Sequence, residues 1–97
     1  MFVVQRRSRA VADGRRVLAE IRATAVNQDG RTVGLTAPSG TAQSRLFRKA
    51  LDASGVRPED IGMVEGHGTA TRLGDRTELR SLAQTYGATA PGAGALL

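Results

Sequence analysis

The chain has 97 residues, of which 40% are hydrophobic but only 3% aromatic, and a formal net charge of +5. This length permits one small domain or part of a larger one. Because aromatic side chains usually supply much of the apolar surface of a core, an independent core would be marginal. The chain has no cysteine, which excludes disulfides and cysteine-based metal sites within it.

Basic charge in a small chain can indicate a nucleic-acid or acidic-surface partner. Here most basic residues are spread along the sequence, and one cluster lies near the start: Arg6, Arg7, Arg9, Arg15 and Arg16. Proteins that bind single-stranded nucleic acid usually interleave aromatic and basic residues, and that pattern is absent. We therefore expect a solvated run and no nucleic-acid partner. No apolar run approaches the ~18 residues of a membrane span, and no secretory signal is visible, so we expect no membrane association and a cytoplasmic location.

The first third of the chain predicts a short helix and a strand. Residues 10–12 extend a short helix that Asp13 and Gly14 end. Residues 17–27 then alternate with period two, which is typical of a half-buried strand. The apolar face consists of Val17, Ala19, Ile21, Ala23 and Ala25. Residues 27–30 (Asn-Gln-Asp-Gly) form a turn, and residues 31–40 are expected to be a loop.

Residues 41–54 predict an amphipathic helix. Apolar residues recur at spacings of three and four from residue 42 to residue 53. Ser39 or Thr41 can cap its start, and Gly55 lies where a left-handed C-terminal cap is expected. Residues 57–60 form a turn that leads to a second strand at residues 61–65.

The second strand leads into a loop that contains the only histidine, His67, among glycines and threonines. Such a loop either presents a functional group or is a structural turn. Asp75 and Glu78 then have the spacing of a capping box. A helical stripe follows at Leu79, Leu82, Ala83 and Tyr86, and the helix ends at Gly87. Residues 88–97 lack periodicity and are predicted to be an unstructured Ala/Gly/Pro tail.

The predicted order is therefore strand-loop-helix-strand-loop-helix, which favours the α/β class. Within it, residues 64–75 read Val-Glu-Gly-His-Gly-Thr-Ala-Thr-Arg-Leu-Gly-Asp. This stretch resembles Val-Glu-Ala-His-Gly-Thr-Gly-Thr-x-Leu-Gly-Asp of the β-ketoacyl synthase (ketosynthase) domains of modular type I polyketide synthases. Residues 25–30 (Ala-Val-Asn-Gln-Asp-Gly) and 34–40 (Gly-Leu-Thr-Ala-Pro-Ser-Gly) resemble two further blocks of the same domains, in the same order.

The resemblance divides the chain into an unmatched basic segment (residues 1–9), a partial ketosynthase domain (10–87) and the tail (88–97). It implies a fragment of a thiolase-like fold, in which two mixed sheets lie between helix layers. The two predicted strands would belong to different halves of that fold, and each would need neighbouring strands that this chain does not supply. Ketosynthases are several times longer, and the abrupt ends of the match resemble a shortened or frame-disrupted reading frame.

In the family a cysteine carries the growing acyl chain as a thioester, and two histidines assist decarboxylation of the malonyl extender and stabilise the enolate. His67 matches the first of these histidines. Thr69 and Thr71 match the threonines that hydrogen-bond the pantetheine arm of the acyl carrier protein. The resemblance thus implies an acyl carrier protein as partner, with its phosphopantetheine, but no cofactor or metal bound directly by this chain.

The remaining site positions are expected to be structural. Glu65 matches a buried glutamate before the histidine, and Gly68 lets the backbone pass close to the arm. Asp75 and Glu78 match the Gly-Asp-x-x-Glu that opens the next helix, and helix capping is our preferred role for them.

This sequence also departs from the family pattern. The cysteine and the second histidine segment (Lys-Ser-Asn-x-Gly-His) are missing, so we expect the chain alone to be inactive. Gly66 replaces an alanine, and Ala70 replaces a glycine at a position where positive φ is expected, which predicts strain. An Arg-Thr pair at residues 76–77 replaces Pro-Ile.

Two alternatives from other classes stay open. The chain could be one subunit of a split ketosynthase that assembles with the remaining segments, and it could pair with a second copy of itself as a homodimer. It could also be a small basic binding protein on a relict scaffold. A third interpretation, a dinucleotide-binding turn at residues 66–71, is rejected. It lacks the third glycine and the acidic residue of a second strand, and the predicted helix begins too late.

Overall fold

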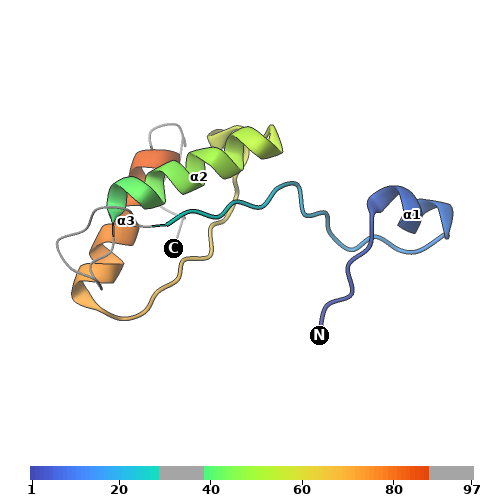
Figure 1. Ribbon diagram of the computed structural model, residues 1–97, viewed down its shortest axis with the longest axis horizontal. Helices are drawn as coiled ribbons and strands as arrows, with labels where there is room; N and C mark the ends of the chain where they lie inside the picture. The colour runs from blue at the N-terminus through green and yellow to red at the C-terminus, as the bar shows by residue number, and fades with distance from the viewer. Residues whose placement is uncertain (29–38, 88–97) are drawn as a thin grey trace.

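The computed structural model describes residues 1–28 and 39–87. Its elements are α1 (Arg7–Ala12), α2 (Gly40–Ser54), the short 3-10 helix η1 (Pro58–Asp60) and α3 (Arg72–Tyr86). Figure 1 shows α2 and α3 together at one end of the molecule and α1 at the other, joined by a long irregular stretch.

Helix α1 ends as the sequence predicts. Asp13 follows its last turn, and Gly14 adopts a left-handed φ of 65°. The Asp13 carboxylate accepts a hydrogen bond from Arg9 Nε at 3.1 Å, and Arg7 forms an ion pair with Glu20. The arginines at positions 6, 7 and 9 are exposed.

Helix α2 begins and ends with the predicted caps. Ser39 Oγ accepts the Ala42 N–H at 3.2 Å, and Gly55 takes the left-handed conformation with φ 66°. These contacts satisfy backbone groups that a helix end leaves without intrahelical partners. Ser39, rather than Thr41, is therefore the cap.

Helices α2 and α3 pack on each other through small and polar side chains. Ser81 of α3 is only 1% exposed, and its hydroxyl donates to the Gly40 carbonyl of α2 at 3.2 Å. Farther along, the rings of Phe47 and Tyr86 lie 5.9 Å apart between centroids. Partial burial there raises the pKa of the Tyr86 phenol. The two helices thus form the only extensive helix contact in the described part of the chain.

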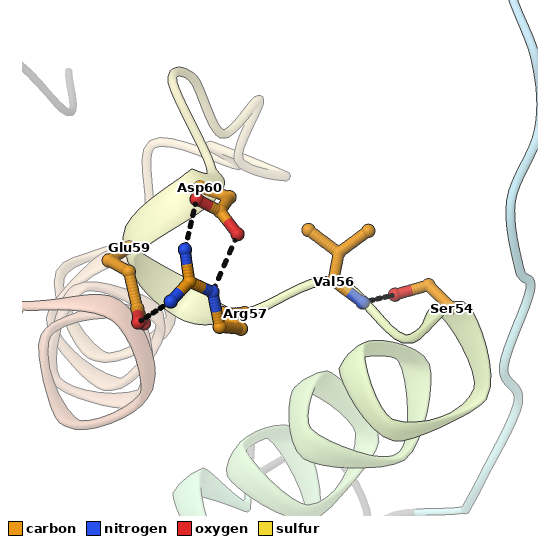
Figure 2. Close-up of polar contacts among 5 residues, drawn as sticks. All are labelled: Ser54, Val56, Arg57, Glu59 and Asp60. Carbon is orange, nitrogen blue, oxygen red and sulfur yellow. Dashed lines mark hydrogen bonds and ion pairs between the residues drawn. The ribbon is translucent and has the colours of Figure 1, made fainter.

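A compact turn joins α2 to η1, as Figure 2 shows. The Arg57 guanidinium donates two hydrogen bonds to the Asp60 carboxylate, at 2.9 and 3.0 Å, and also lies 3.3 Å from Glu59. The hydrogen bond from Arg57 lowers the pKa of Asp60. Ser54 Oγ accepts the Val56 N–H at 3.1 Å. This turn redirects the chain towards the His67 loop.

The two predicted strands are not found, and this corrects the strand part of the α/β prediction for the described residues. Residues 17–27 and 61–65 form neither helix nor strand. The physical reason is that a strand is completed by hydrogen bonds to a neighbour, and the described part of the chain offers none. Residues 29–38 and the predicted tail at 88–97 lie outside the described residues.

Little apolar surface is buried among residues 1–28 and 39–87. The buried hydrophobic residues are Ala10, Ala42 and Leu51. Large apolar side chains are exposed along the first 26 residues and on the surface around α3; they are Met1, Phe2, Val3, Val4, Val11, Val17, Leu18, Ile21, Val26, Met63, Leu73 and Leu79. The core of the described residues is therefore small, as the composition predicts.

Candidate functional site

The His67 loop is held to α3 by a single carboxylate. Glu78 Oε1 accepts the backbone N–H of His67 at 2.6 Å, and Glu78 Oε2 accepts that of Gly68 at 3.0 Å. Hydrogen bonds to an ionised carboxylate favour the charged form. The bonds from Gly68 and His67 accordingly lower the pKa of Glu78. One side chain thus fixes the backbone on both sides of the histidine Cα.

The two threonines of the loop lie together at the start of α3. Thr71 is the N-cap, and its Oγ1 accepts the Gly74 N–H at 3.2 Å. Thr69 Oγ1 lies 3.2 Å from Thr71 Oγ1. A Cβ on Gly74 would collide with the Thr71 hydroxyl oxygen, so this glycine allows the threonine to cap the helix.

The capping box predicted at Asp75 and Glu78 is wrong. Helix α3 begins at Arg72, one turn earlier, and Asp75 lies within its first turn. The reason is that Thr71 provides a cap sooner, while Glu78 is already bonded to the loop. The Asp75 Oδ1 atom is buried without a hydrogen-bond partner among the described residues. The early helix start also removes one argument against a dinucleotide-binding turn, but the missing third glycine and second strand still exclude it.

The strain predicted at Ala70 is present. Ala70 has φ 60° and is the only non-glycine residue of the described chain with positive φ. Gly68, two residues earlier, has φ 53°. At Gly66, a Cβ would lie 3.3 Å from Glu78 Oε1, so the glycine leaves room for the carboxylate that bonds the loop. The family pattern has alanine at position 66 and glycine at position 70.

The structure brings some of the predicted site residues together and leaves others apart. His67, Thr69 and Thr71 are all exposed in one loop, which Glu78 holds from α3. Glu65 is exposed here and makes no hydrogen bond or ion pair in the described part of the chain. The buried environment implied for Glu65 is therefore not found, because no element of the described chain covers it.

Sequence reasoning missed Gly74 and the bidentate role of Glu78. The signal for Gly74 was a glycine three residues after a threonine, the spacing of a hydroxyl cap and its donor. The spacing between Asp75 and Glu78 also fits a capping box. The sequence therefore did not predict that Glu78 bonds the His67 loop.

Chemically, the site presents one imidazole and two hydroxyl groups to solvent. An imidazole can donate a hydrogen bond to a carbonyl oxygen and stabilise charge that develops there. The chain has no cysteine, and no group of three or more histidine or acidic residues in the described ranges has a metal-binding arrangement. The arrangement is therefore one of hydrogen-bonding side chains that are open to solvent.

The profile of the β-ketoacyl synthase C-terminal domain matches residues 18–96, and the chain belongs to this family. The match to the family extends beyond residue 87, into the segment that was predicted from the sequence to be a tail.

Relatives and solved structures agree with this assignment. The chain is 52% identical over 91 residues to a mycocerosic acid synthase-like polyketide synthase of Mycolicibacterium smegmatis, covering 94% of this chain and 4% of that protein. It is 56% identical over 88 residues to erythronolide synthase EryA3 of Saccharopolyspora erythraea, covering 91% and 3%. The OzmH KS7 ketosynthase domain of Streptomyces albus JA3453 superposes with a TM-score of 0.80 at 46% identity, over 84% of this chain and 14% of that one. The chain thus spans a small part of each of these three proteins, and it matches part of a thiolase-like ketosynthase fold.

The described helices include none that is long and apolar enough to cross a bilayer.

Proposed function

We propose that this chain supplies the histidine–threonine loop of a polyketide β-ketoacyl synthase, which joins acyl thioesters by decarboxylative Claisen condensation. The observation that carries the proposal is the pair of hydrogen bonds that the backbone N–H groups of His67 and Gly68 donate to the Glu78 carboxylate. Hydrogen bonds on both sides of the His67 Cα fix the point at which its side chain leaves the loop, and catalytic groups need such positioning.

In the proposed reaction the extender loses carbon dioxide, and the resulting enolate carbon attacks the acyl thioester held on cysteine. A new carbon–carbon bond forms, and the cysteine thiolate leaves. His67 would donate a hydrogen bond to the extender thioester oxygen as negative charge develops on it. The cysteine and the second histidine must come from outside these 97 residues.

Thr69 and Thr71 would bind the phosphopantetheine arm of an acyl carrier protein. Thr71 Oγ1 already accepts the Gly74 N–H, so its own proton is available for donation to Thr69 or to the arm. The exposure of both threonines leaves their hydroxyls accessible to a carrier protein.

The test is a condensation assay with an acyl thioester and a malonyl-loaded acyl carrier protein, with products identified by mass spectrometry. The 97-residue chain alone should give no condensed product. Product should form when a ketosynthase polypeptide carrying the cysteine and second histidine is added, and His67→Ala should abolish it. Product from the chain alone, or full activity of the His67→Ala chain, would contradict the proposal.

A further inference from the structure

Helix α3 carries a row of arginines on an exposed face. Arg72, Arg76 and Arg80 recur every four residues, so they lie on one side of the helix. All three are exposed, whereas Ser81 is buried where α3 contacts Gly40 of α2. Arg76 stands where the family pattern has proline. The complete set of Arg72, Arg76 and Arg80, called the arginine row below, is therefore a feature of this chain and not of the family pattern.

The arginine row has no counter-charge in the described part of the chain. The ion pairs formed among residues 1–28 and 39–87 all involve other arginines. Glu78, two residues after Arg76, instead accepts the N–H groups of His67 and Gly68. Like charges four residues apart destabilise a helix, and positive charge in the first turn, at Arg72, opposes the helix dipole. The row thus makes α3 less stable and gains no ion pair among the described residues.

The row begins beside the two threonines that we propose to bind the phosphopantetheine arm. Arg72 directly follows Thr71, whose hydroxyl caps α3 and lies 3.2 Å from the hydroxyl of Thr69. Because an α-helix rises about 1.5 Å per residue, the row extends about 12 Å along the axis from this point. A protein that delivers its arm to the threonines therefore lies within reach of the row.

Spacing and charge indicate which surface of that protein the row fits. Guanidinium groups form paired hydrogen bonds with carboxylates. Acidic residues four apart on a helix have the same spacing as the three arginines, so an acidic helix can face the whole row. A second copy of this chain would place arginines opposite arginines, which is unfavourable.

We propose that the arginine row is a docking surface for an acidic helix of the acyl carrier protein. The row holds the carrier protein beside the start of α3, so that its arm enters the loop at Thr71. The three arginines thus act in binding and take no part in the chemical step. This inference rests on the proposed function, because that function names the carrier protein as the partner.

The experiment is an NMR titration of the full 97-residue chain with a polyketide synthase acyl carrier protein that lacks its phosphopantetheine arm. Without the arm, binding does not depend on the threonines or on catalysis. The amide signals of residues 72–80 should shift, and the affinity should fall as salt screens the charges. Replacing all three arginines (Arg72→Gln, Arg76→Gln and Arg80→Gln) should weaken binding about tenfold, because three exposed ion pairs of modest strength are lost together.

The matched control removes the same number of charges elsewhere. Arg6, Arg16 and Arg22 are exposed and lie outside α3, so their combined replacement by glutamine should change the affinity less than twofold. Glutamine and arginine have similar helix propensities, and the triple replacement in α3 relieves like-charge repulsion. Its helix signal should therefore melt at the same or a higher temperature than that of the parent, which separates lost binding from lost folding.

The possible outcomes separate this inference from the proposed function. Binding that depends on the row, without product in the condensation assay, supports the docking surface and contradicts the function. Binding only of a carrier protein that has its arm overturns the docking surface and leaves the function standing. Equal weakening by the two triple replacements, or no binding, also overturns it. Tighter binding of mixed-sequence DNA than of the carrier protein, lost in the α3 variant, overturns it in favour of a general polyanion surface.

Discussion

At the residue scale, Glu78 connects a helix to the loop that carries the histidine. Its two oxygens accept two consecutive backbone N–H groups, so a single ionised group sets the position of His67. Such charge-assisted bonds are stronger than neutral ones. The state of this carboxyl therefore determines how well the loop is ordered.

This dependence predicts a pH effect. The pKa of Glu78 is lowered in the folded chain, whereas the pKa of a glutamate in an unfolded chain is about 4.3. The stabilisation from Glu78 is therefore complete above that value and is lost as the pH falls through the lowered folded pKa. In an NMR titration, the amide shifts of His67 and Gly68 should move together with an apparent pKa below about 4.3.

The matched variants are Glu78→Gln and Glu65→Gln. Glu78→Gln keeps the size of the side chain but replaces one acceptor with a donor, so it should shift both amide signals at neutral pH and remove their titration. Glu65 is exposed and contacts neither amide, so its variant should titrate as the parent does. Unchanged His67 and Gly68 signals in Glu78→Gln would show that the carboxylate does not hold the loop.

Ala70 gives a second prediction at this scale. A left-handed residue with a Cβ costs roughly 1–2 kcal/mol, whereas the greater freedom of glycine in the unfolded chain costs about 0.4–1 kcal/mol. Ala70→Gly should therefore stabilise the loop by about 0.5–1 kcal/mol, which slows amide exchange at His67 and Gly68 about two- to fivefold.

The converse change is Gly68→Ala, at φ 53°. It introduces the same left-handed penalty, so exchange at these amides should become faster. Slower exchange in Gly68→Ala, or no change in Ala70→Gly, would mean that backbone strain does not govern the loop.

The strain at Ala70 was predictable because it depends on one residue and one backbone angle. The role of Glu78 was not, because its spacing from Asp75 fits a capping box and its spacing from His67 has no local signature. The way the loop folds back on α3 decides that Glu78 accepts from the His67 and Gly68 N–H groups instead of forming a capping box with Asp75.

At the element scale, the helices were predictable and the strands were not. Helix α2 contains its own backbone partners and both of its caps, so residues 39–55 carry all the information needed. Residues 17–27 carry a strand pattern, but no other segment of the described chain pairs with their backbone. The start of α3 was misplaced because Thr71 and Asp75 are both good caps and only the loop geometry selects between them.

The contact between α2 and α3 predicts the effect of a core substitution. Ser81 is 1% exposed, and a Cβ built on Gly40 would already lie 3.4 Å from Ser81 Oγ. Ser81→Leu should overfill this contact and destabilise the helix pair by roughly 1–3 kcal/mol. Arg80→Leu, on an exposed neighbouring position, is the control and should stay within about 0.5 kcal/mol of the parent.

The measurement is thermal melting of helix circular dichroism, together with fluorescence of the single tyrosine. Tyr86 lies against Phe47 in the same helix contact, so its signal reports separation of α2 from α3. Equal melting of the Ser81→Leu and Arg80→Leu chains would show that the small-residue contact does not hold the helices together.

At the scale of the whole molecule, the described chain has the burial expected of a part rather than of a complete domain. Only three hydrophobic residues are buried, and twelve large ones are exposed. Composition predicted this, because scarce aromatic residues limit the core regardless of the fold. The chain also occupies 14% of the ketosynthase domain on which it superposes. The small core of the described residues accords with a chain that covers only a small part of that domain.

A molecule of this kind should unfold without a single cooperative transition. Cooperative unfolding requires that separate regions share a core, yet the described chain has one extensive helix contact, between α2 and α3, and α1 lies apart from it. In a urea titration of the monomer, the helix signal and the Tyr86 fluorescence should change gradually and at different midpoints. Binding of the remaining ketosynthase polypeptide should bring the two transitions together, because ligands of the native state stabilise it and a shared core couples the regions. A sharp, coincident transition in the isolated monomer would show that these 97 residues already contain a sufficient core, and that the exposed apolar surface has another cause than missing elements.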